Sequence, residues 1–72
     1  MSNKISFLEK LGSQIRRFRK EQNMSLDKLA ALCDYEKANL SRIESGKTNA
    51  TVFTLYNISK VMNIDMRRFF EE

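Results

Sequence analysis

The sequence contains no proline, only two glycines and a single cysteine. So few turn-forming residues, with acidic and basic side chains mixed, favour a helical globular protein over a strand-and-turn protein or a disordered tail. One cysteine cannot form an internal disulfide, so the composition gives no indication of secretion.

Histidine is absent as well. With one cysteine, this leaves no zinc-binding constellation and no histidine-based catalytic pair. We therefore expect no metal, no cofactor, no small-molecule ligand and no enzymatic activity.

Long apolar stretches are also missing. The longest uninterrupted run covers residues 29–33, far short of the roughly 20 residues that a membrane span needs. The first ten residues lack the apolar segment of a signal peptide. We expect a cytoplasmic protein that does not enter a membrane.

The chain has 72 residues, of which 42% are hydrophobic, and a net charge of +4. This length predicts one small domain over residues 1–72, burying about 60% of its unfolded surface, so that dimerisation would add useful stability. A positive charge raises the odds of an acidic partner such as nucleic acid, although many such surfaces bind nothing.

The spacing of apolar residues predicts an all-α fold, a compact bundle of five helices. The first extends from Ile5 to Gln22 with apolar residues at intervals of three and four, and Gly12 within it indicates a close helix crossing. We expect later helices to begin at Ser25, Glu36, Thr51 and Asp65, and helices to end at Asn23, Asp34, Gly46 and Asn63. The predicted core residues are Leu8, Leu11, Ile15, Phe18, Leu29, Leu32, Cys33, Tyr35, Leu40, Ile43, Leu55, Ile58 and Met62.

The segment from Leu26 to Ser45 predicts two short helices joined by a tight turn at residues 34–36. Ala30 and Ala31 are small enough for the second helix to cross close to the first. That helix would leave a short, cationic, polar face outward on a rigidly held element, which is what reading a DNA major groove requires. The outward residues are Lys37, Ala38, Ser41 and Arg42.

A longer pattern of residues extends from the first predicted helix to the fourth. It consists of Ile15, Arg16, Phe18, Arg19, Met24, Ser25, Leu29, Ala30, Leu40, Ser41, Arg42, Ile43, Glu44, Gly46, Thr54, Leu55 and Ile58. With these flanking helices in register, the chain resembles the Cro/repressor-type (Xre) helix-turn-helix domain, of the phage-repressor DNA-binding type. It departs from that family at Leu26, where a phosphate-binding glutamine is common, and at Asp34, Tyr35, Glu36 and Ala50.

The resemblance implies that the third predicted helix enters the major groove of double-stranded DNA. Arg42 can then bind guanine, and Lys37 can bind guanine or phosphate. Ala38 can contact a thymine methyl, and Ser41 is the fourth residue expected to contact bases. Asn39 can reach adenine if the helix tilts. The expected phosphate-contacting residues are Ser25, Lys28, Ser45, Lys47, Thr48, Asn49 and Thr51.

The resemblance also implies an ion pair between Arg19 and Glu44 beneath the reading helix. It further implies a homodimer on a palindromic operator. Because the chain ends shortly after Phe70, we expect the dimer interface in the last two helices, with Met66 and Phe70 as its residues and Val52 or Phe53 beside them.

Two functions stay open at this stage. The first is a DNA-binding transcriptional regulator, either a repressor or a controller of a mobile or restriction element; Lys37, Arg42 and the basic first helix favour it. The second is a protein-interaction or antitoxin-like module on the same scaffold, favoured by Leu26 and Glu36. A steep dependence of DNA binding on salt would distinguish the regulator from the module.

Overall fold

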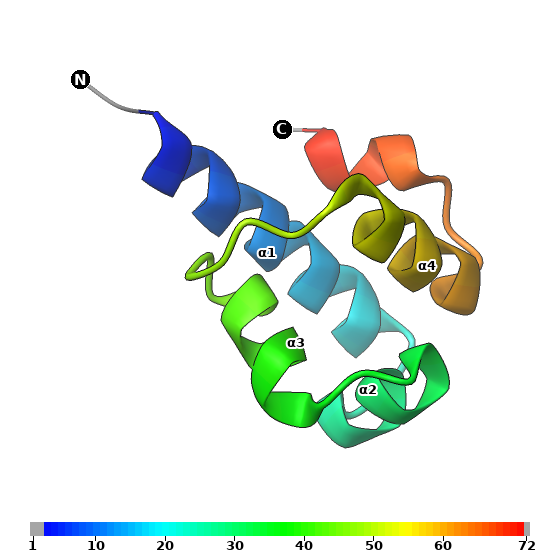
Figure 1. Cartoon of the computed structure of the whole chain (residues 1–72). Coiled ribbons are helices and arrows are strands. Elements are labelled where there is room, and N and C mark those ends of the chain that lie inside the picture. The colour runs from blue at the N-terminus through cyan, green and yellow to red at the C-terminus, as the bar shows by residue number, and fades with distance from the viewer. Residues whose placement is uncertain (1–2, 72) are drawn as a thin grey trace.

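Four α-helices and one 3₁₀-helix make up residues 3–71, the part of the chain that the computed structural model describes (Figure 1). The prediction of an all-helical fold is confirmed, but that of five α-helices is wrong. The last element is a 3₁₀-helix because it has only five residues and is closed by a bond from Arg68 N–H to the carbonyl of Asp65 at 2.9 Å. The elements are α1 (Lys4–Glu21), α2 (Leu26–Cys33), α3 (Lys37–Glu44), α4 (Val52–Met62) and η1 (Met66–Phe70).

The predicted side chains cap the N-terminal ends of α2 and α4. Ser25 Oγ accepts a hydrogen bond from Lys28 N–H at 3.0 Å, and Thr51 Oγ1 accepts one from Thr54 N–H at 3.1 Å. Glu36 precedes α3 but makes no such side-chain bond. The predicted helix ends are confirmed by positive φ angles, which are 56° at Asn23, 61° at Asp34, 75° at Gly46 and 56° at Asn63.

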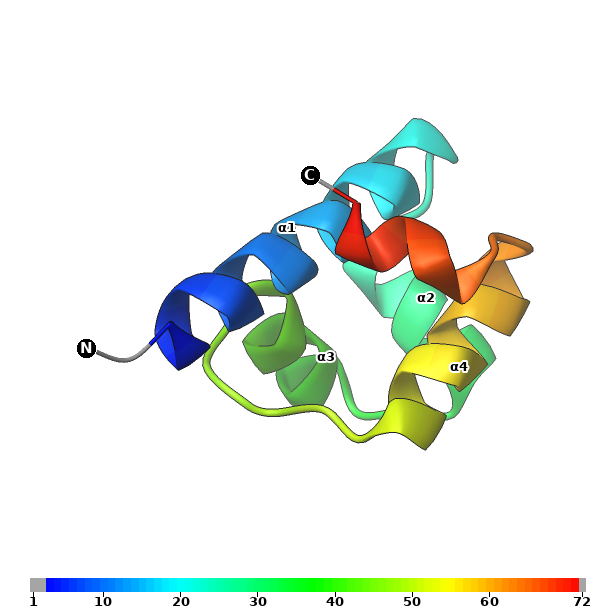
Figure 2. The same cartoon turned by 90° about the horizontal axis from the view of Figure 1, so that it is seen from above.

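The core lies among all five elements. The longest helix, α1, packs against α3 and η1, while α2 contacts α3 and α4 (Figures 1 and 2). The rings of Phe18 and Phe69 lie 6.0 Å apart, so η1 closes the core at the end of the described chain. The side chains with almost no exposure are Ile15, Leu29, Leu40, Ile58 and Phe69.

Two details of the predicted packing are wrong. Leu32 is 51% exposed, because it lies roughly 60° around α2 from Leu29, on the side away from the buried Ala30 and Cys33. Ala31 is exposed, so only Ala30 lies in the core. Tyr35 packs against the core as predicted but is half-buried, and its hydroxyl accepts a hydrogen bond from Asn57 Nδ2 at 3.2 Å.

Cys33 is a buried thiol, as predicted for a small core hydrophobe. Burial raises its pKa above the usual value, so the neutral form dominates near neutral pH.

Gly12 lies at the crossing of α1 and α3. A Cβ on Gly12 would lie 2.4 Å from the carbonyl oxygens of both Ile43 and Glu44. The close helix crossing is therefore confirmed, and it brings the backbone of α1 against the C-terminal turn of α3.

We expect Gly12→Ala to lower the free energy of unfolding by about 1–3 kcal/mol, the usual cost of overpacking. Alanine favours a helix by about 1 kcal/mol over glycine, but here its Cβ meets backbone that cannot rotate away. Urea denaturation measures the change, with Ser13→Ala as the control because Ser13 is exposed on the same helix. A Gly12→Ala variant as stable as the parent would contradict this account.

Candidate nucleic-acid interface

The outer face of α3 consists of Lys37, Ala38, Ser41 and Arg42, which are all exposed. The opposite side of the helix is anchored, because Leu40 and Ile43 are buried in the core. The structure thus brings the four predicted base-contacting residues together on the exposed side of a short, fixed helix.

Arg19 and Glu44 lie in contact beneath this helix and form a two-pronged ion pair. Arg19 Nε lies 2.7 Å from Glu44 Oε2, and Arg19 Nη2 lies 3.0 Å from Oε1. Arg19 Nη1 also donates to the carbonyl of Met24 at 2.8 Å. Less than a tenth of either side chain is exposed. Arg19 therefore joins the end of α1, the segment before α2 and the end of α3.

The electrostatics of this pair favour its charged form. The hydrogen bond to Glu44 raises the pKa of Arg19 above its already high ordinary value, outweighing the effect of burial. Each oxygen of the carboxylate accepts one guanidinium N–H, so the two buried charges compensate each other.

Both cations of the outer face have a polar partner within the protein. Lys37 Nζ lies 3.4 Å from Asp27 Oδ1, across the turn between α2 and α3. Arg42 donates through Nη2 to Asn39 Oδ1, one turn earlier on α3. Neither contact was predicted from the sequence, although residues three apart on a helix, such as Asn39 and Arg42, are neighbours on its surface. Asp27 and Lys37 are brought together only by the turn.

The predicted phosphate-contacting residues occupy two separate regions. Ser25 and Lys28 lie at the start of α2, where the Ser25 hydroxyl already accepts a hydrogen bond from the Lys28 backbone N–H. Ser45 is also engaged, donating to the carbonyl of Ser41 at 2.9 Å. The remaining residues lie between α3 and α4; of these Lys47, Asn49 and Thr51 are exposed and Thr48 is half-buried.

A depression beside the outer face joins some of these residues. Thr48, Asn49 and Thr51 line it together with Asn39 and Arg42. Lys47 does not, and instead lines a second depression against the start of α1. Tyr35 and Thr54 also line the first depression. Tyr35 was predicted as a core residue, and Thr54 was not among the predicted contact residues.

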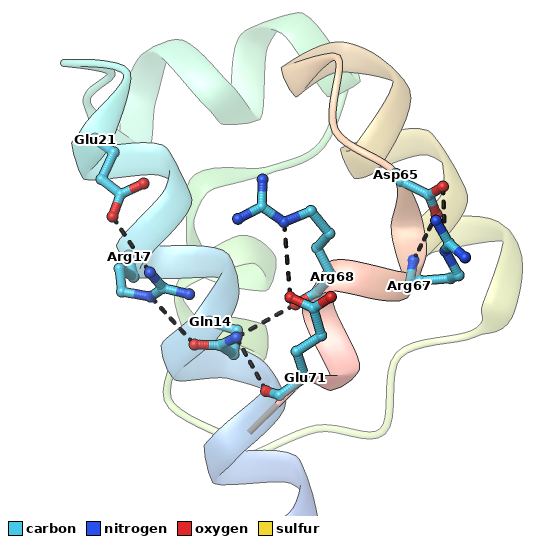
Figure 3. A network of polar contacts seen from close by, with 7 residues as sticks. All are labelled: Gln14, Arg17, Glu21, Asp65, Arg67, Arg68 and Glu71. Carbon is cyan, nitrogen blue, oxygen red and sulfur yellow. Dashed lines mark hydrogen bonds and ion pairs between the residues drawn. The ribbon is translucent and has the colours of Figure 1, made fainter.

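A network of polar contacts connects α1 to η1 and the residue after it, through Gln14 (Figure 3). Gln14 Nε2 donates to the backbone carbonyls of Arg68 and Glu71 at 3.3 and 3.1 Å. The guanidinium groups of Arg17 and Arg68 lie 4.5 and 4.9 Å from the centre of the Phe18 ring. Arg17 also pairs with Glu21 at 3.3 Å, so its charge is not left for a ligand alone.

Several apolar side chains of α4, α1 and η1 are exposed. Val52 and Phe53 at the start of α4 are 71% and 70% exposed. Phe70 is partly exposed and stacks on Phe7, with ring centres 6.2 Å apart. Met66, predicted to be exposed, is half-buried and packs against the core because η1 turns it inward.

Within residues 3–71, no cluster of histidine, cysteine, aspartate and glutamate could hold a metal ion. No helix in the described range has the length and apolar character required to cross a membrane.

Comparison with known proteins identifies similar chains. A family model described as helix-turn-helix matches residues 15–69. Control protein C.BamHI of Bacillus amyloliquefaciens is 35% identical over 65 residues, which cover 89% of this chain and 78% of that protein.

Two solved structures extend the comparison. The restriction-modification controller protein C.AhdI from Aeromonas hydrophila has a TM-score of 0.88 at 23% identity, covering 90% of this chain and 98% of that one. The biofilm master regulator SinR, solved in complex with DNA, has a TM-score of 0.78 at 31% identity over 85% of this chain and 98% of its own. The C.AhdI likeness shows the fold, whereas SinR shares sequence as well.

Proposed function

This chain belongs to the Cro/repressor-type (Xre) helix-turn-helix family, and from that premise we propose that it is a sequence-specific, double-stranded DNA-binding transcriptional regulator and not an enzyme. The observation that carries the proposal is the outer face of α3, where polar and cationic side chains stand exposed on an anchored helix. A helix presented in this way fits the DNA major groove. The similarity to control protein C.BamHI favours a control protein among such regulators.

In the proposed complex, α3 lies in the major groove with its outer face on the base edges. Arg42 donates two hydrogen bonds to guanine O6 and N7, Lys37 donates one to a base acceptor, and Ala38 contacts a thymine methyl. Ser41 adds a hydroxyl that can donate or accept. Phosphates are contacted from α2 and from the α3–α4 connection, by Ser25, Lys28, Ser45, Lys47, Thr48, Asn49 and Thr51.

Selection from a random duplex pool, followed by titration of the selected duplex at several salt concentrations, tests the proposal. We expect a defined sequence to emerge, and log K to fall with log salt by about 0.9 for every phosphate neutralised. An interaction module would give neither result. Leu26 packs against the core and has no polar group, so it cannot make the phosphate contact of the glutamine common at this position in the family, but it leaves the outer face intact.

We also propose that the regulator is a homodimer on a palindromic operator, with half-sites about 34 Å apart. The exposed apolar side chains support this proposal, since a monomer gains nothing by exposing them. Phe70 belongs to the proposed interface, and Val52 and Phe53 contribute more than the half-buried Met66.

Sedimentation at increasing protein concentration tests the dimer. We expect Phe53→Ser and Phe70→Ser each to weaken self-association, because each removes apolar area from the interface. Ile5→Ser is the control, since Ile5 is also exposed but lies near the start of α1. A protein that sediments as a monomer with and without its selected duplex would rule out the dimer.

A further inference from the structure

Asp27 places a negative charge at the edge of the proposed DNA-binding surface. Its Oδ1 atom lies 3.4 Å from Lys37 Nζ, and both side chains are more than half exposed. Asp27 lies in the first turn of α2, and Lys37 is the first residue of α3. The pair therefore spans both helices of the helix-turn-helix at the side where α3 presents its N-terminal residues.

Stability alone gives a weak reason for this pair. Exposed ion pairs of this kind contribute little to folding, because water and salt screen them. A carboxylate close to DNA also repels phosphate, so Asp27 lowers affinity for every duplex. Neither folding nor overall affinity accounts for Asp27, whereas its contact with Lys37 can affect how that lysine binds DNA.

A lysine without a partner is a poor reader of bases. Its ammonium group sits on a flexible stem with four carbons and donates in no fixed direction, so it satisfies phosphate as readily as a base. Asp27 restricts Lys37 in two ways. The ion pair limits the positions of Nζ, and the carboxylate repels any phosphate oxygen that approaches the same ammonium group.

We propose that Asp27 is a specificity-determining positioning residue, which holds Lys37 for a base edge and prevents its use as a non-specific phosphate contact. The inference rests on the proposed function and assigns to this acid the repulsive element that selective binding often requires. Lys37 donates to an acceptor such as guanine N7 or O6, while Asp27 penalises duplexes that offer Lys37 only phosphate.

Neighbouring residues provide matched controls. Glu36 is an exposed acid directly before Lys37, but the carboxylate that pairs with Lys37 belongs to Asp27. Glu36→Gln and Asp27→Asn therefore remove the same charge from the same region, and only the second removes the partner of Lys37. Arg42 is held by the neutral amide of Asn39, so its contact should not change in either variant.

The test measures dissociation constants by fluorescence anisotropy for three kinds of duplex: the selected sequence, its single-base variants and an unrelated sequence. For Asp27→Asn we expect tighter binding to the unrelated duplex with a salt slope steeper by about 0.9, one extra phosphate. Selectivity at one base pair should fall roughly 5- to 10-fold, as for a lost base contact. Glu36→Gln should tighten binding to all duplexes alike and keep their ratios.

The Lys37→Gln background shows whether Asp27 acts through Lys37. There, Asp27→Asn should no longer alter base preference, although it still relieves repulsion from phosphate. An Asp27→Asn variant with unchanged selectivity, or one that changes selectivity equally in the Lys37→Gln background, would overturn the inference while leaving the proposed function intact. A parent protein that binds no duplex selectively would overturn both.

Discussion

Glu44→Ala is expected to lower the free energy of unfolding by roughly 3–5 kcal/mol, the cost of leaving one charge of a buried pair without its partner. Arg19 would keep its buried position but lose both hydrogen bonds to the Glu44 carboxylate. The end of α3 would also lose its polar attachment to α1. DNA binding should therefore weaken along with stability, because the reading helix is no longer held at this end.

Thermal and urea unfolding measure the first effect, and Glu21→Ala is the matched control. Glu21 also accepts from an arginine, Arg17 at 3.3 Å, but in an exposed pair on a single helix. Such pairs contribute about 0.2–0.5 kcal/mol, so Glu21→Ala should be nearly as stable as the parent. If the two variants unfolded at the same urea concentration, the Arg19–Glu44 pair would have no structural importance.

Arg42→Ala is expected to weaken binding to the selected duplex by roughly 1–3 kcal/mol, about 5- to 150-fold, and to relax the preference for guanine at one position. The folded state should be unaffected, since Arg42 is exposed and contacts the neighbouring Asn39. Anisotropy titrations with all four bases at each position measure the change.

Two companion variants separate base contact from charge. Arg42→Lys keeps the charge but cannot donate two parallel hydrogen bonds, so it should lose most of the guanine preference. Lys28→Ala should weaken all duplexes equally and reduce the salt slope by about 1, as expected for a phosphate contact. An Arg42→Ala variant with the parent's base preference would remove Arg42 from the base-contacting residues.

The boundaries of the helices were predictable because they depend on residues close in sequence. Ser25 and Thr51 begin helices through bonds to amides three residues later, and Asp34 and Gly46 end them with left-handed backbone. Gly12 was also predictable, because a glycine inside a helix with a clear apolar stripe needs a reason, and a close crossing is the commonest one.

Other features depend on packing that local patterns do not contain. Leu32 fits the apolar spacing of α2 as well as Leu29 does, yet it is exposed because it lies on the side of α2 away from the buried Ala30 and Cys33. The inward turn of Met66 follows from the 3₁₀ form of η1. Asp27 and Lys37 are neighbours only after the turn at Asp34 has folded, so their contact could not be predicted from spacing.

The buried and exposed residues of α3 have separate roles, and this separation affects how the target sequences of such proteins can evolve. Leu40, Ile43 and Glu44 are buried and hold the helix in place, whereas the four residues of its outer face are all exposed. Changes at those four positions should therefore be nearly neutral for folding, within about 0.5 kcal/mol. New target sequences can evolve on this scaffold one side chain at a time, without a compensating change in the interior.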